Sequence, residues 1–600
     1  MTGVKKRMVL KNREAAGKNL ISKNRNMAGK MEMEKLFRFM NIFLAVIPFL
    51  AGLYFEYFSC LAGIVLFGYL IYEIRRQECV YFRLNDASMA VIVLVVFYGI
   101  SIVFAVDRGM ALWGMFKFFP LFPFLLLLLQ MDRGQRLLLM KPIPFAGSAM
   151  VVLSCILLAV PFLRNFLLVN GRLGGFFQYP NTFAMYLLIG LIVLYAGDLF
   201  YERQRKVILT VLLLGGIFLS GSRTVAGLTL AAAICLIWFH RAQLKWMDRS
   251  RRRLIVILFL LIAAAGLGIL LGYRFYLSGG TFFGDPGRSS LSTFWGRLLY
   301  FQDALGQIAK HPFGLGYMGY YLTQGEFQTG VYSVMFVHND WLQILLDVGW
   351  IPAFFMLLAL IKALISKGQF ATQKMVLVFF ILHGMFDFDL QYLCMFFLLI
   401  LALDLEAEKQ YSLRMSAISS GALGVLGFLA IAGSLYIGLG NFTYYIGNIK
   451  LSCQIYPANT FAKLRLLTEV ETAEELEVMA DDLLVRNEKL ALAWNAKAKA
   501  AYSKGDFAEV ITAKKKAMAL EKYNMDTYED YFTMLADGAE LYEASGDEQS
   551  AEICRMEIKN IQTVLDEVIG ATSPFAWKTV DEPQLEMSAE YQYYVEQMEK

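Results

Sequence analysis

Long apolar stretches alternate with short polar ones along the first three quarters of the chain. Scanning for runs of about 17 to 25 mostly apolar residues, the length that crosses a bilayer as a helix, finds a series of candidate spans. They lie at residues 36–55, 57–74, 88–106, 111–130, 145–163, 181–199, 206–220, 224–240, 254–276, 339–364, 374–386, 392–405 and 415–440. Because several are short, the pattern predicts about 11–13 transmembrane helices. We therefore expect an all-α, polytopic helical membrane protein.

Composition agrees with this reading and limits the chemistry. Of the 600 residues, 57% are hydrophobic and 18% are charged, and the mean hydropathy is +0.49, which is too apolar for a soluble domain. The seven cysteines occur singly and without CxxC spacing, so neither a zinc site nor a disulfide framework is expected. No cofactor is predicted.

Basic residues are distributed unevenly between the loops. Residues 1–35 carry ten Lys and Arg before the first apolar run, which reads as a cytoplasmic tail leading into an uncleaved signal-anchor. With that tail in the cytoplasm, the predicted inner loops hold 20 Lys and Arg and the outer loops hold 7, as the positive-inside rule requires. This orientation places Arg223, the loop 277–336, His338 and Asp387 together on the outer face. The net charge of +5 is modest. The clustering of basic residues therefore carries orientation information, and no nucleic-acid partner is expected.

The long outer loop, residues 277–336, carries turn-forming glycines such as Gly314 and Gly316. This chemistry indicates an ordered lid over the membrane region. Within the loop, residues from Arg297 to Lys310 have helical spacing of apolar side chains, which predicts a helix on the outer surface.

The composition changes after the last predicted span. Residues 449 to about 570 are rich in Ala, Glu, Lys and Leu with helical periodicity, and we expect an extracytoplasmic helical region at 441–600. Ala491 to Asn524 resembles one tetratricopeptide repeat, although Tyr523 stands where that family usually has proline. A second, weaker unit is expected from Thr527 to Ile561, with Gly546 at its turn. Such repeats commonly bind proteins, so this region is also a candidate site for a protein partner.

Four short motifs in the membrane region lie in a fixed order. They are Ser220-Gly221-Ser222-Arg223-Thr224; Arg297 to Leu305 ending in His311-Pro312-Phe313-Gly314-Leu315-Gly316; His338-Asn339 followed by a leucine-rich run and Gly349; and His383-Gly384-Met385-Phe386-Asp387-Phe388. Together they resemble the signature of the O-antigen ligase and polymerase superfamily of bacterial membrane glycosyltransferases. The resemblance covers roughly residues 170–390, within a predicted ligase-like domain at 36–440.

The resemblance implies a multi-pass enzyme of the cytoplasmic membrane that acts on its outer face. The donor would be a glycan linked to a polyprenyl diphosphate, with its lipid tail among the membrane helices. His338 would deprotonate an acceptor hydroxyl, and Arg223 and Arg297 would stabilise the departing diphosphate. Arg172 is a further candidate for diphosphate binding, and Asn339 and Asp387 would support the site. The acceptor stays open between a growing glycan, a lipid or wall anchor, and a protein hydroxyl.

Each of these residues also has an ordinary structural interpretation. His338 could anchor a helix at the lipid interface, Arg223 could reach the lipid headgroups, and Asp387 could form a structural ion pair. His383 lies one turn before Asp387 and could simply pair with it. Asp347 should point away from His338 and satisfy a buried partner. His240 and His311 are given no role.

Two other classes of protein fit the same hydropathy pattern. A transporter or flippase of lipid-linked glycans would spread charged residues along a pathway at mid-membrane depth, whereas the motif residues here gather on one face. A non-catalytic membrane scaffold would rely on the C-terminal helices and should tolerate loss of His338. No acidic cluster with metal-ligand spacing lies on the outer face, so metal dependence is not expected.

Overall fold

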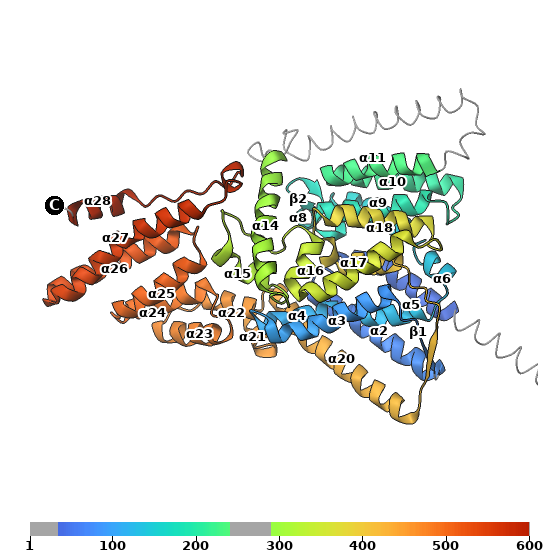
Figure 1. Ribbon diagram of the computed structural model, residues 1–600, viewed down its shortest axis with the longest axis horizontal. Helices are drawn as coiled ribbons and strands as arrows, with labels where there is room; N and C mark the ends of the chain where they lie inside the picture. The colour runs from blue at the N-terminus through green and yellow to red at the C-terminus, as the bar shows by residue number, and fades with distance from the viewer. Residues whose placement is uncertain (1–33, 78, 240–289, 599) are drawn as a thin grey trace, which may run out of the picture.

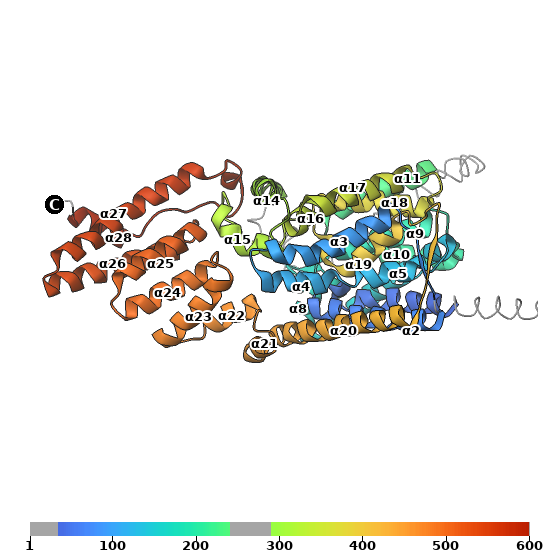
Figure 2. The same ribbon diagram turned by 60° about the horizontal axis from the view of Figure 1, so that its bottom comes forward.

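The computed structural model describes residues 34–77, 79–239, 290–598 and 600. The predicted tail at 1–33, the predicted span at 254–276 and the first part of the outer loop lie outside this range. The described chain forms a helical bundle, followed by a set of C-terminal helices that extends from one end of the bundle (Figures 1 and 2). Helix α14 (Ser290–Lys310) and helix α15 (Gly319–Phe327) stand between these two parts.

The bundle is built from apolar helices that cover one another. After a helix at residues 34–46 come α2 (Glu56–Gln77), α3 (Asp86–Phe104), α4 (Arg108–Phe118), α5 (Leu121–Leu129), α6 (Arg133–Leu138), α7 (Ile143–Leu157), α9 (Pro180–Tyr195), α10 (Arg203–Ser220), α11 (Arg223–Phe239), α16 (Asp340–Val348), α17 (Trp350–Ile365), α18 (Ala371–Gly384), α19 (Leu393–Ala402) and α20 (Ala417–Tyr445). In α9 and α19 almost every side chain is buried, as expected of helices that are apolar on all faces. These two helices form the centre of the bundle.

Five helices of the described chain are long and apolar enough to cross a membrane. They are Glu56–Arg76, Asp86–Phe104, Arg108–Leu129, Arg133–Leu157 and Ile418–Tyr445. Shorter apolar helices account for several of the other predicted spans, namely Pro180–Tyr195, Arg223–Ile237, Trp350–Ile365, Ala371–Gly384 and Leu393–Ala402. The chain is thus a helical membrane protein, and the total of 11–13 spans stays a prediction.

The structure differs from the predicted one in two details, the presence of short strands and the break of one expected span. Short antiparallel strands pair β1 (Cys79–Phe82) with β4 (Tyr411–Arg414), and β2 (Leu168–Val169) with β3 (Arg172–Leu173). The expected single span at 339–364 is also wrong, because the helix breaks at Gly349 into α16 and α17. The chain is therefore nearly all helical.

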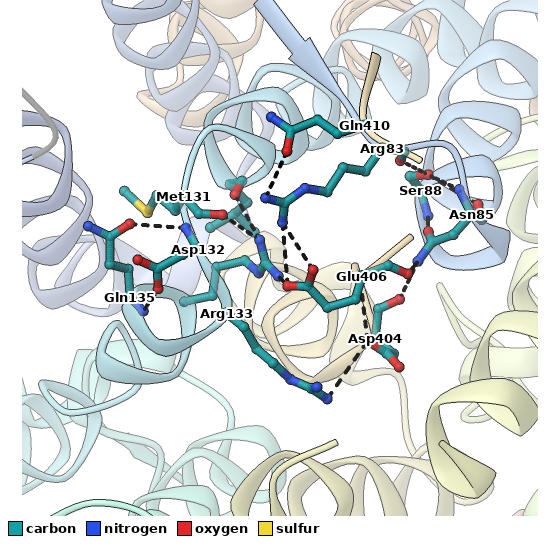
Figure 3. Close-up of polar contacts among 12 residues, drawn as sticks. Arg83, Asn85, Ser88, Met131, Asp132, Arg133, Gln135, Asp404, Glu406 and Gln410 are labelled. Carbon is teal, nitrogen blue, oxygen red and sulfur yellow. Dashed lines mark hydrogen bonds and ion pairs between the residues drawn. The ribbon is translucent and has the colours of Figure 1, made fainter. Parts of the chain in front are cut away.

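Polar contacts close the end of the bundle opposite the C-terminal helices (Figure 3). Glu406 pairs with Arg83, at 3.3 Å, and with Arg136. Asn85 caps α3 and donates to the carbonyl of Asp404 at 2.6 Å. Three loops that the basic-residue pattern assigns to one side of the membrane thus meet at one end, joined by the paired strands β1 and β4.

The C-terminal region consists of helices that pack against their sequence neighbours. They are α21 (Ile449–Ile455), α22 (Thr460–Leu467), α23 (Ala473–Arg486), α24 (Ala491–Ser503), α25 (Phe507–Leu520), α26 (Met525–Ser545), α27 (Glu548–Ala571) and α28 (Ala589–Met598). The two predicted helical pairs are present as α24–α25 and α26–α27, with left-handed Gly505 and Gly546 in their turns. Their identity as tetratricopeptide repeats stays a prediction.

The C-terminal helices contact the bundle and α15 directly. The Tyr456 hydroxyl donates to the carbonyl of Gly109 at 2.8 Å, and the backbone N–H of Ser573 donates to the carbonyl of Thr329 at 2.8 Å. A Cβ on Gly325 of α15 would lie 2.0 Å from the carbonyl oxygen of Leu520. Such backbone approach shows that the region is docked on the loops at this end of the bundle, hereafter the site end.

Candidate functional site

His338 lies in the extended segment that leads into α16. Its backbone is left-handed, with φ of 55°, a conformation that a non-glycine residue adopts at some cost. Asn339 follows as the N-cap, and its Oδ1 accepts from the backbone N–H groups of Trp341 and Leu342 at 3.0 and 3.1 Å. Its Nδ2 donates to the carbonyl of Met385 at 3.0 Å. Asn339 therefore starts the helix and also ties it to the segment that bears Asp387.

The imidazole of His338 is partly covered, with 23% of the side chain exposed. Its Nδ1 is buried and lies 3.7 Å from Oδ1 of Asp387, which is longer than a hydrogen bond. The rings of Phe388 and Tyr300 flank it, with centroids at 4.9 and 6.2 Å. Nε2 makes no hydrogen bond to the described residues and is left to meet a ligand.

Asp387 is the carboxylate on which the site converges. Its oxygens accept from the Tyr179 hydroxyl and from Nδ2 of Asn181, both at 2.8 Å. Nη2 of Arg297, on α14, lies 3.7 Å from Oδ2. Burial acts to raise the pKa of Asp387, but the interactions with His338, His383 and Arg297 together outweigh burial and hold the pKa below its usual range. A carboxylate in these surroundings stays ionised.

The two other candidate arginines lie differently. Arg172 donates through Nη2 to Oδ1 of Asn181 at 2.6 Å and through Nε to the carbonyl of Ser220 at 2.9 Å. It is therefore linked to Asp387 through one intervening amide. Arg223 is exposed at the first turn of α11. Within the described chain no ion pair joins Arg223 to the other candidates.

A second buried group of polar side chains lies beside Asp387. His383 Nδ1 lies 2.5 Å from Oδ2 of Asp389, and the Thr182 hydroxyl donates to Oδ1 of Asp389 at 2.6 Å. The expectation that His383 pairs with Asp387 is therefore corrected. The turn after α18 (Ala371–Gly384) brings Asp389, six residues on, back to His383.

The loop at 312–316 packs against the end of α16, and glycine allows this close backbone approach. Leu315 N–H donates to the carbonyl of Leu346 at 2.6 Å, and Trp350 N–H donates to the carbonyl of Pro312 at 3.0 Å. At Gly349, φ is +81°, and a Cβ there would lie 2.2 Å from the oxygen of Pro312. The spacing of eleven residues between His338 and Gly349 predicts that another helix or a lipid chain approaches the helix face that carries His338. Instead Gly349 ends α16 and admits the loop at 312–316.

Asp347 takes the structural role predicted for it. Its oxygens accept from Nε2 of Gln343 at 2.8 Å and from the Tyr98 hydroxyl at 3.2 Å. Gln343 in turn accepts from the backbone N–H of Val337 at 3.0 Å. This chain of hydrogen bonds fixes the residue next to His338.

Residues 208–387 match the family model described as O-Antigen ligase. The matched region holds Arg223, Arg297, His338 and Asp387, whereas Arg172 and the C-terminal helices lie outside it. The match supports a membrane glycan ligase or polymerase type of function. No curated protein and no solved structure gives a significant match to the chain.

The arrangement offers a base beside an anion and a cation. Nδ1 of His338 faces one oxygen of Asp387, Nε2 of His338 is left without a hydrogen bond to the described residues, and Arg297 supplies positive charge next to the other oxygen of Asp387. In the described part of the chain no three His, Cys, Asp or Glu side chains are grouped to hold a metal. Tyr179, Asn181 and Asp389 were not predicted as site residues. Their only signal was a polar side chain at the end of an apolar span.

Proposed function

We propose that the protein is a membrane glycosyltransferase that uses a glycan linked to a polyprenyl diphosphate and acts on the outer face of the cytoplasmic membrane. The observation that supports this most is the grouping of His338, Asp387 and Arg297 at one end of a helical bundle. All three belong to the region that matches the O-antigen ligase family model.

The proposed reaction begins with the acceptor hydroxyl near Nε2 of His338. Asp387 orients the imidazole so that Nδ1 carries the hydrogen and Nε2 is free to accept a proton. The acceptor oxygen then bonds to the anomeric carbon of the donor while its proton passes to Nε2. The bond between that carbon and the diphosphate oxygen breaks, and the lipid diphosphate leaves with the electron pair.

The leaving diphosphate needs positive charge, which in this proposal comes from arginine. Guanidinium groups present paired donors suited to phosphate oxygens. Arg297 lies beside Asp387, and the exposed Arg223 is free to meet a ligand at the same end of the bundle. The exposed apolar side chains of Met335, Met385 and Phe386 border His338 in sequence or space and suit the first part of a lipid tail.

The experiment that tests this function compares the host with and without the protein. We expect its loss to change the surface polysaccharide and to raise the pool of lipid-linked glycan. Missing long chains would identify a polymerase, missing attachment to a lipid or wall anchor would identify a ligase, and missing protein glycans would identify a protein O-oligosaccharyltransferase. Unchanged surface glycans together with an unchanged lipid-linked pool would contradict the proposal.

A further inference from the structure

A cleft of about 820 Å³ opens between α14, α15 and the C-terminal helices, and His338 is not among the residues that line it. Its walls include Gly306 and Lys310 from α14, Glu326 from α15, and residues 484–489, which form the end of α23 and the turn that follows it. The volume lies within the range of ordinary ligand sites. The membrane region and the C-terminal region build this cleft jointly.

Helix α14 separates the cleft from the candidate active site. Arg297 and Tyr300 point to the site, where they approach Asp387 and His338. Gln302, Gly306 and Lys310 line the cleft, and their spacing of four residues puts them on one other face of the same helix. A ligand in the cleft would therefore lie one helix diameter, about 10–12 Å, from the reacting groups.

The charged groups of the cleft largely neutralise one another. Lys489 Nζ lies 2.8 Å from Oε1 of Glu326. Asp303 accepts from the Thr329 hydroxyl at 2.7 Å and from the Tyr332 hydroxyl at 2.9 Å. Burial lowers the pKa of Lys522, and Asp303 and Glu326 partly offset that effect. Little net charge is left to attract a polyanion.

Amide side chains in the cleft keep capacity for hydrogen bonds. Gln307 makes no side-chain hydrogen bond to the described residues although only 9% of it is exposed. Nδ2 of Asn487 is buried without a hydrogen-bond partner of ordinary geometry in the described chain, although Asp107 lies close enough to interact with it electrostatically. An amide both donates and accepts, as does a hydroxyl. The remaining wall exposes both polar and apolar surface, and a purely apolar peptide would leave its polar groups without partners.

We propose that this cleft binds a saccharide chain, a ligand rich in hydroxyl groups and without strong net charge. The inference rests on the proposed function, in that the bound saccharide is the glycan acceptor or the growing product of the transfer. A chain held there continues around α14 to His338, so the cleft would retain a glycan between successive encounters with the donor.

Gly306 offers a direct way to fill the cleft. It lies on α14, and a Cβ added there meets no atom within 4 Å, so Gly306→Trp places a large side chain in the cleft without a clash at its base. Gly306→Ala is the matched control because it keeps the cleft open and favours the helix. Leu305→Trp adds the same bulk at the neighbouring exposed position, which does not line the cleft.

The measurement is binding of oligosaccharides, released by mild acid from the host's own surface polysaccharide, to the purified full-length protein. We expect the wild type, Gly306→Ala, Leu305→Trp and His338→Asn proteins to bind alike and Gly306→Trp to bind at least tenfold more weakly. Inorganic pyrophosphate serves as the anionic probe, and its binding should not change with Gly306→Trp.

The inference is overturned if the wild type binds no oligosaccharide or if Gly306→Trp binds oligosaccharide as well as the wild type does. It is also overturned if Gly306→Trp weakens the binding of pyrophosphate instead. These outcomes concern only the cleft. The catalytic proposal is tested separately by the turnover of the His338→Asn protein, so either proposal can fail while the other stands.

Discussion

At the scale of single residues, Asp387 is the side chain that contacts most of the other groups in the site. The same carboxylate accepts hydrogen bonds from Tyr179 and Asn181 and lies 3.7 Å from both His338 and Arg297. A buried carboxylate of this kind stays charged only because its partners outweigh the cost of burial. Loss of its charge should affect both the orientation of His338 and the stability of the site end.

Asp387→Asn tests this through the pH dependence of stability. Because the folded-state pKa of Asp387 lies below its usual range, the carboxylate contributes stability above the unfolded pKa of about 4. That contribution is lost as pH falls from there through the folded pKa. We expect Asp387→Asn to lower the melting temperature at pH 7, and the gap from the wild type to narrow only below about pH 4. A gap that is absent at pH 7, or that widens in acid, would show that Asp387 is not a stabilising anion.

Replacing the arginines by lysine separates charge from geometry. Arg223→Lys and Arg297→Lys keep the positive charge but lose the planar fork that matches a diphosphate. We expect each to lower kcat/KM for the lipid-linked donor by about tenfold or more, equivalent to about 1.4 kcal/mol. Arg205→Lys is the control, because Arg205 is exposed and pairs with Glu202 before α10. Wild-type kinetics in both site variants would contradict the proposed role of these arginines in binding the diphosphate.

Sequence predicted some of these residues and not others, for a physical reason. His338, Arg297 and Asp387 belong to motifs of recognisable order, and the structure brings them together. Tyr179 and Asn181 lie at the start of the apolar helix α9, where polar side chains usually meet water or lipid headgroups. Only the folded chain, in which residues 179–181 and 385–388 come into contact, shows that they hydrogen-bond to Asp387.

At the scale of elements, glycines decide where backbone segments meet. The apolar run after His338 has the pattern of one continuous membrane helix, and periodicity alone does not reveal the break at Gly349. The break follows from a neighbour distant in sequence, since the carbonyl of Pro312 occupies the space that a side chain at 349 would need. The helix α14, in contrast, was predictable because its apolar spacing is local.

Gly349→Ala should therefore be costly although alanine favours helices. Its φ of +81° and ψ of −166° lie in a region that essentially only glycine adopts, and the new Cβ would overlap Pro312. We expect a loss of about 2 kcal/mol or more of stability, seen as a lower melting temperature in detergent. Gly306→Ala is the control and should be neutral or stabilising. Equal melting temperatures for Gly349→Ala and the wild type would refute the packing account.

At the scale of the whole molecule, the two ends of the bundle differ in character. One end carries the candidate site and the docked C-terminal helices, and the other carries the Arg83, Arg136 and Glu406 contacts (Figures 1 and 3). Hydropathy predicted the apolar helices, and composition predicted a separate C-terminal helical region. Docking of that region depends on backbone approach, as at Gly325 and Leu520, which has no signature in sequence.

The orientation of this molecule can be measured by cysteine labelling in intact cells. Val485 and Phe200 are 88% and 81% exposed. Val485 lies on α23, among the C-terminal helices, and Phe200 lies in the loop between α9 and α10. With the exposed Cys155 and Cys235 replaced by alanine, we expect a membrane-impermeant reagent to label Val485→Cys directly. Phe200→Cys should react only after permeabilisation, as the basic-residue bias requires. The reverse pattern would place the site on the cytoplasmic side and contradict the use of an outer-face donor.

The most direct test of the central claim is the turnover of purified His338→Asn protein with a lipid-linked glycan donor and a hydroxyl acceptor. Asparagine tolerates the left-handed backbone of residue 338 but accepts no proton at neutral pH. We predict that kcat falls about 10²- to 10⁴-fold while the donor binds with unchanged Kd. Turnover within a few-fold of the wild type would contradict the assignment of His338 as the base.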